Sequence, residues 1–123
     1  FTRGITKPTV NREVFEQVEQ LIGDRESDLT ALEKRKWDLV IDNSGRNAAW
    51  TKKTAELLKG NVGNYIYTSS TGVYFPYTTS DIQENKSVLF KMPENTTDPV
   101  LKMEYEYGVM KANSEREAIT AFG

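Results

Sequence analysis

The fold class is decided by Trp37-Asp38-Leu39-Val40-Ile41-Asp42 and the Asn43-Ser44-Gly45 that follows it. A short apolar run that ends in turn residues is typical of a buried parallel strand. Residues 47–59 have the spacing of an amphipathic helix, which Gly60 is placed to end. Residues 64–69 are rich in aromatic and β-branched side chains, which predicts a second strand. Strand, helix and strand with short connections predict an α/β fold, in which helices cover a parallel sheet.

Weaker signals precede this unit. Residues 1–4 have the pattern of a strand end, and residues 5–13 have the composition of a loop. The apolar spacing of residues 14–22 fits a helix, but residues 18–22 fit a short strand equally well. A one-turn helix is expected over 28–33, with Asp28 as its N-cap.

Two longer segments follow the second strand. Residues 75–99 are polar and hold three of the four prolines, which predicts an insertion loop. Residues 100–122 contain no proline and many good helix formers, which predicts a helix. The order of elements indicates a single domain over residues 1–123, a length usual for one domain.

The composition excludes several classes of chemistry. The 123 residues include no histidine and no cysteine, which excludes a Ser-His-Asp triad, a cysteine nucleophile and a zinc site of the usual His/Cys kind. No metal site is expected, and a general base must be Asp, Glu, Lys or Tyr. A net charge of -2 argues against a nucleic-acid partner. No apolar run is long enough for a membrane span, so we expect a cytoplasmic protein, unless an export signal stands upstream of Phe1.

Polar residues follow both expected strands. Asn43, Ser44 and Gly45 come after the first, and the segment 68–72, Thr-Ser-Ser-Thr-Gly, ends the second. In an open parallel sheet, ligands bind beyond the carboxyl ends of the strands. These residue types are also common in turns and caps, so the pattern alone leaves both interpretations open.

Tyr107 and Lys111 form a second candidate pair. Positions four apart share a helix face, so the ammonium can lie near the phenol and favour its ionised form. The same spacing also fits an exposed helix face on which the two side chains merely pack.

Taken together, these segments resemble the extended short-chain dehydrogenase/reductase family. The segment 67–74, Tyr-Thr-Ser-Ser-Thr-Gly-Val-Tyr, looks like that family's strand with a catalytic Ser or Thr four residues before the tyrosine of a Val-Tyr pair, which assigns the role to Ser70. The segment 107–111, Tyr-Gly-Val-Met-Lys, matches the family's Tyr-Gly-x-x-Lys. Residues 1–4, 21–25 and 38–45 are similar to the ends of its second, third and fourth strands, which favours a strand for 18–22.

The resemblance implies a mechanism. Tyr107 would be the acid/base, Lys111 would hold the nicotinamide ribose and favour ionisation of the tyrosine, and Ser70 would donate a hydrogen bond to the substrate oxygen. Ser70, Thr71 and Tyr107 would contact the substrate, by default a nucleotide-sugar. The implied activity is that of an NAD(P)-dependent oxidoreductase or epimerase, which interconverts an alcohol and a carbonyl. A homodimer formed through the helix over 100–122 is also expected.

The implied cofactor is NADP, with NAD as the alternative. Arg3 follows the first strand end with no acidic residue near it, which favours a 2′-phosphate over a free ribose hydroxyl. A solvated turn arginine would have the same sequence. The residues implied to bind the cofactor are Arg3, Gly4, Asp24, Arg25, Asn43, Ser44, Gly45, Ser69 and Lys111.

Two parts of the family pattern are missing from the chain. The Gly-x-x-Gly-x-x-Gly loop, which places pyrophosphate at a helix N-terminus, is absent, and so is the C-terminal substrate region. We therefore expect the central part of a Rossmann-type, doubly wound parallel sheet, with weak or no cofactor binding and no turnover by this part alone. The alternative is a non-catalytic nucleotide- or RNA-binding or regulatory module on the same fold.

Overall fold

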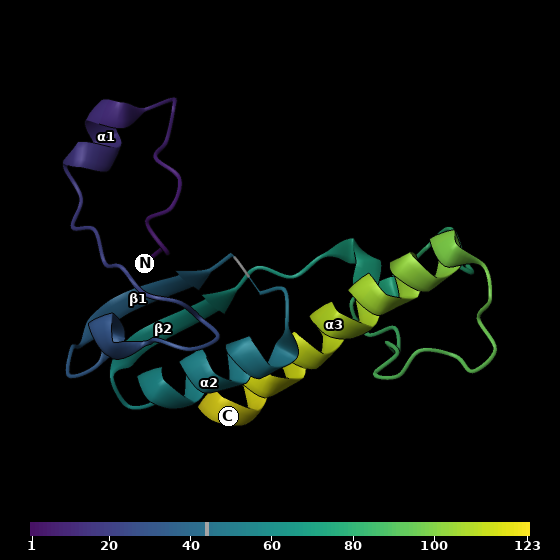
Figure 1. Cartoon of the computed structure of the whole chain (residues 1–123). Helices are drawn as coiled ribbons and strands as arrows, with labels where there is room; N and C mark the ends of the chain where they lie inside the picture. The colour runs from purple at the N-terminus through teal and green to yellow at the C-terminus, as the bar shows by residue number, and fades with distance from the viewer. Residues whose placement is uncertain (44) are drawn as a thin grey trace. The chain divides into compact units, whose positions relative to one another are not determined.

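The computed structural model describes residues 1–43 and 45–123 and divides into two compact units. The first unit is Phe1–Lys36 and the second is Trp37–Gly123, and each is described by itself (Figure 1). Across the described ranges, none of the helices has the length and apolar character that spanning a membrane requires.

The second unit is built on a two-stranded parallel sheet. Strand β1 (Trp37–Asp42) pairs with strand β2 (Val62–Tyr67), in a register that runs from Trp37 opposite Val62 to Asp42 opposite Tyr67. Helix α2 (Ala48–Leu58) connects the two strands, so the expected βαβ unit is confirmed. The mixed α/β class follows from this unit and its helices.

The ends of helix α2 are determined by the residues that flank it. The Asn47 side chain accepts a hydrogen bond from the backbone N–H of Ala49 at 2.9 Å, which satisfies one of the free donors of the first turn. Gly60 has a φ of 77°, a conformation that glycine adopts without a Cβ penalty, and the chain turns there towards β2.

Helix α3 (Pro99–Phe122) is the longest element of the chain. Its N-cap is Asp98, whose carboxylate accepts hydrogen bonds from the backbone N–H groups of Val100 at 2.8 Å and Leu101 at 3.2 Å. Pro99 occupies the first turn, where its missing N–H costs nothing. The predicted helix is therefore confirmed, with one more residue at its start.

Helices α2 and α3 pack side by side on one face of the sheet (Figure 1). Both helices bury small residues: Ala55 on α2 is 0 % exposed, and Ala112 on α3 is 1 % exposed. Thr51 and Ser114 are also fully buried, so the two backbones approach closely. On the opposite face of the sheet, Leu39, Ile41 and Ile66 are exposed.

A short 3₁₀ helix and a long loop connect β2 to α3. The 3₁₀ helix η2 (Thr71–Tyr74) packs against α3 and buries Gly72 and Val73. Residues 75–98 form the predicted loop, which begins with Phe75 in edge-to-face contact with Tyr105 of α3 at a centroid distance of 4.7 Å.

The first unit contains little regular structure. Helix α1 (Arg12–Glu16) and the 3₁₀ helix η1 (Thr30–Leu32) are its two helical segments. A single parallel bridge joins Thr2 to Ile22, with hydrogen bonds from the Thr2 N–H to the Leu21 carbonyl and from the Gly23 N–H to the Thr2 carbonyl.

Three boundary predictions were wrong. Strand β2 covers 62–67 rather than 64–69, because its pairing with β1 begins at Trp37 and ends at Asp42. Residues 14–22 form neither a continuous helix nor a strand: α1 ends at Glu16, and only Ile22 pairs. Asp28 is not the N-cap of η1, although its carboxylate accepts a hydrogen bond from the Thr30 N–H at 3.0 Å.

Candidate functional site

Lys111 is a buried cation on the sheet-facing side of α3. Its side chain is 6 % exposed, and its ammonium donates a hydrogen bond to the Thr68 carbonyl at 2.9 Å. The same ammonium lies 5.1 Å from the centroid of the Tyr67 ring. The carbonyl dipole and the ring face offset the loss of water around the charge. The chain therefore anchors Lys111 directly at the carboxyl end of β2.

Tyr107 lies one helical turn before Lys111 and contacts η2. A Cβ placed on Gly72 would lie 3.1 Å from Cδ1 of Tyr107 and 3.3 Å from Oγ of Ser70. The Tyr107 ring and the Ser70 hydroxyl are thus both next to the same glycine. Tyr107 is 44 % exposed, and within the described ranges its hydroxyl has no hydrogen-bond partner, so the phenol is accessible to a ligand.

Two glycines make this approach possible. An ideal Cβ on Gly108 would lie 2.3 Å from the carbonyl oxygen of Gly72, a distance that a real Cβ does not reach. The backbones of α3 and η2 are therefore in contact at Gly108, the residue after Tyr107. A side chain at Gly108 would meet the Gly72 backbone and push α3 away from η2, whereas a Cβ at Gly72 would meet only the Tyr107 and Ser70 side chains, at 3.1–3.3 Å.

Ser70 is held in place by its own side chain. It is the N-cap of η2, and its hydroxyl oxygen accepts a hydrogen bond from the Gly72 N–H at 3.1 Å. Since the oxygen acts as the acceptor in this bond, the hydroxyl proton is left to donate to a ligand. Thr71, the next residue, is exposed at the start of η2.

The carboxyl ends of the two strands are tied together. The Thr68 hydroxyl donates to Oδ1 of Asn43 at 2.5 Å, and the Thr68 N–H bonds the Asp42 carbonyl. Gly45 is buried, and a Cβ there would lie 2.9 Å from the Tyr67 hydroxyl. Asn43, Gly45 and Ser69 therefore lie near the same strand ends, whereas Ser44 lies outside the described residues.

The other expected cofactor residues belong to the first unit. Arg3 and Gly4 follow Thr2, and Asp24 and Arg25 follow the segment bridged to it, so all four lie beyond the ends of one parallel pair. Gly4 has a φ of 70°, which favours glycine, and Arg3 is exposed. The Asp24 carboxylate accepts a hydrogen bond from the Glu26 N–H at 2.7 Å.

Comparisons with known proteins give no relative from which a function could be transferred. No family model, no curated protein and no solved structure was found to match the chain. The functional interpretation therefore depends on the arrangement of its own side chains.

The structure adds polar groups that sequence reasoning missed. Asp42 is 6 % exposed and accepts a hydrogen bond from the Tyr65 hydroxyl at 2.5 Å. Tyr65 and Tyr67 alternate along β2, so both face α3, a pattern that period-two alternation could have revealed. The Thr68 carbonyl that holds Lys111 gives no sequence signal, because every residue has one.

Proposed function

We propose that the chain carries the catalytic side chains of an NAD(P)-dependent oxidoreductase or epimerase of the extended short-chain type. The observation that supports this best is the meeting of Ser70 and Tyr107 beside Gly72, with Lys111 buried one helical turn from Tyr107. An exposed phenol, a serine hydroxyl with a free proton and a fixed cation are the groups that alcohol–carbonyl interconversion needs. The substrate class proposed is a hydroxyl-bearing sugar such as a nucleotide-sugar.

Each side chain has one role in this proposal. Tyr107 is the acid/base: its phenol oxygen accepts the proton of a substrate hydroxyl as the carbonyl forms, and returns it in the reverse direction. Ser70 donates its hydroxyl proton to the same oxygen while charge develops on it. Lys111, fixed by the Thr68 carbonyl, keeps a positive charge on the Tyr107 face of the helix.

The donors present fit a nicotinamide cofactor. A lysine ammonium carries more N–H donors than the one bond to Thr68 uses, so Lys111 can also bind ribose hydroxyls. In the first unit, taken by itself, Arg3 is an exposed cation of the kind that accommodates a 2′-phosphate, and this residue alone is the reason for proposing NADP over NAD. A nicotinamide bound there would supply the hydride acceptor and donor that alcohol–carbonyl interconversion requires.

The test uses the natural protein that contains these residues, with Tyr107→Phe and Tyr105→Phe as a matched pair. Both changes remove one phenolic hydroxyl from α3, but Tyr105 is not one of the proposed catalytic residues, and its ring packs edge-to-face on Phe75. NADP-dependent oxidation is measured by absorbance of the reduced cofactor with a panel of nucleotide-sugars. We expect Tyr107→Phe to lower kcat by at least about a hundredfold, and Tyr105→Phe to leave it nearly unchanged.

Survival of the activity in Tyr107→Phe would refute the catalytic role. A protein that binds NADP or RNA without turnover on any of the sugars would instead support the non-catalytic module. In that case, Lys111→Met would weaken nucleotide binding and Tyr107→Phe would not.

A further inference from the structure

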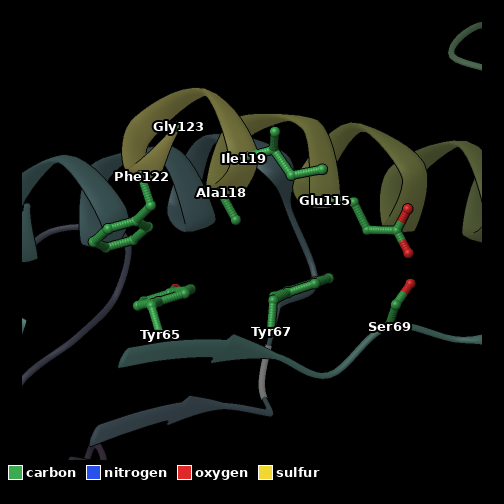
Figure 2. Close-up of a pocket in the computed structure, with 8 residues that line it drawn as sticks. All are labelled: Tyr65, Tyr67, Ser69, Glu115, Ala118, Ile119, Phe122 and Gly123. Carbon is green, nitrogen blue, oxygen red and sulfur yellow. The ribbon is translucent and has the colours of Figure 1, made fainter. Parts of the chain in front are cut away.

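A cavity of about 400 Å³ lies between β2 and the C-terminal half of α3. Figure 2 shows its floor formed by side chains that rise from the strand and its roof formed by the helix. The lining residues are Tyr65, Tyr67, Ser69, Glu115, Ala118, Ile119, Phe122 and Gly123. The volume lies within the range of roughly 300–1,000 Å³ that is usual for small-molecule sites.

Most of the wall is aromatic or aliphatic. The rings of Tyr65 and Phe122 stack at a centroid distance of 4.8 Å, and Tyr67 stands beside Tyr65 (Figure 2). On the helix side, Ile119 is 68 % exposed and Phe122 is 39 % exposed. These apolar surfaces are therefore open to water, and an apolar ligand that covered them would be bound by the hydrophobic effect.

One end of the cavity is polar and negatively charged. Glu115 extends from α3 towards Ser69 at the end of β2 (Figure 2). Within residues 1–43 and 45–123, the Glu115 carboxylate makes no ion pair, and the buried Ser69 hydroxyl oxygen has no hydrogen-bond partner. A carboxylate can only accept hydrogen bonds, so a ligand group that donates hydrogen bonds and carries positive charge would complement this end.

Lys111 does not supply that charge, although it precedes Glu115 by one helical turn. Its ammonium is bonded to the Thr68 carbonyl and lies over the Tyr67 ring. A bound anion would face the Glu115 carboxylate directly, and a neutral ligand would leave it unpaired. Among the three kinds of ligand, a cation is the best match to the cavity.

We propose that this cavity binds a small organic cation with an aromatic body, an arylalkyl ammonium. The ammonium group would donate to Glu115 and to the Ser69 oxygen, and the aromatic body would pack between Tyr65, Tyr67 and Ile119. The cavity lining contains none of the proposed catalytic residues Ser70, Tyr107 and Lys111, although Ser69 is also among the residues expected to bind the cofactor. Binding therefore needs no nicotinamide cofactor and no turnover.

The experiment compares three probes of matched shape on the full chain. Tryptamine is the cation, tryptophol is its neutral alcohol counterpart, and indole-3-propionate is an anion of similar size. Each is titrated while backbone chemical shifts are followed by NMR. We expect tryptamine to bind saturably, at least about tenfold more tightly than tryptophol, with the largest shifts at Ser69, Glu115 and Ile119.

Two single substitutions on the same helix test the charge. Glu115→Gln keeps the shape but removes a charged hydrogen-bond acceptor, and it is expected to weaken tryptamine binding by about tenfold. Glu117→Gln changes a residue outside the lining and is expected to leave binding unchanged. Tyr107→Phe should also bind tryptamine normally, which separates this proposal from the oxidoreductase.

Equal binding of tryptamine and tryptophol would overturn the proposal, and so would shifts located away from the cavity. An absence of saturable binding to the wild-type chain would overturn it as well. These wild-type results decide the question even if a variant fails to fold.

Discussion

Replacing Gly108 with alanine is expected to destabilise the second unit and to separate the proposed catalytic pair. The new Cβ would lie 2.3 Å from the carbonyl oxygen of Gly72, whereas ordinary van der Waals contact begins near 3.4 Å. The helix and η2 must therefore move apart by about 1 Å. The obstructing atom belongs to the backbone, so no side-chain rotation relieves the clash.

The size of the effect follows from two opposing terms. Overpacking of this kind costs about 1–3 kcal/mol, and a backbone obstacle places Gly108→Ala at the upper end. Alanine in a helix interior is favoured over glycine by about 1 kcal/mol, which offsets part of that cost. We expect the free energy of unfolding to fall by about 2 kcal/mol, and the urea midpoint to fall by about 1 M.

Tryptophan fluorescence is a suitable probe of this change. Trp37 and Trp50, the two tryptophans of the chain, both lie in the second unit, on β1 and α2. Gly60→Ala is the control, because nothing lies within 4 Å of a Cβ there and only the φ of 77° opposes the change. Its expected cost is about 1–2 kcal/mol, with no shift in the NMR signals of Ser70 and Tyr107.

A Gly108→Ala variant as stable as the wild type would refute the contact between α3 and η2. The environment of Ser70 gives an independent readout, since its backbone signals should move in Gly108→Ala. If they did not, the meeting of Ser70 and Tyr107 beside Gly72 would also be wrong.

Three further predictions concern single contacts. Asp98→Ala removes the acceptor of two N–H groups at the start of α3 and should cost about 1 kcal/mol in urea unfolding, whereas Asp98→Asn should cost much less. Thr51→Val should be neutral or stabilising, because within the described ranges its buried hydroxyl has no partner. Thr54→Val should lower the free energy of unfolding by about 1 kcal/mol, because the Thr54 hydroxyl donates a hydrogen bond to the Trp50 carbonyl at 2.9 Å. Equal effects of Thr51→Val and Thr54→Val would contradict this difference in hydrogen bonding. The Arg35 hydrogen bonds hold the pKa of the Glu19 carboxyl below its ordinary 4.5, so this pair stabilises the fold above that pH, and its contribution is lost as pH falls through the lowered pKa. An NMR titration should place the Glu19 midpoint below 4.5 in the wild type and near 4.5 in Arg35→Gln; no difference between the two would contradict the pairing.

The elements that local sequence determines were predictable. The β1 run, Gly60 and the helix formers after Asp98 each act within a few residues, and the structure confirms all of them. The parallel pairing followed from the short connections between β1, α2 and β2. The Rossmann-type arrangement, in which helices cover both faces of a larger sheet, stays a prediction.

The elements that depend on pairing partners were not predictable. The ends of β2 are determined by the residues of β1 opposite them, and residue preference along β2 does not contain that information. Residues 14–22 carry apolar side chains at both helix and strand spacing, so periodicity could not choose between the two. The cavity beside Glu115 also depends on the tertiary position of α3, and no motif marks it.

The contact of Ser70 and Tyr107 with Gly72 is independent of the two sequence motifs that contain them. A tyrosine and a lysine four residues apart on a helix are common, and Ser-rich segments after strands are common too. Local sequence does not, however, require the Ser70 segment and the Tyr107 helix to meet, because a loop of more than twenty residues separates them. They meet where Gly72 and Gly108 allow the two backbones to come into contact. Neither the Tyr-x-x-x-Lys spacing nor the serine run predicts this contact. Among the described residues the exposed Tyr107 hydroxyl has no hydrogen-bond partner, which an acid/base group needs and a purely structural tyrosine does not. This difference supports the enzyme over the binding module, and the Tyr107→Phe and Tyr105→Phe pair measures it directly.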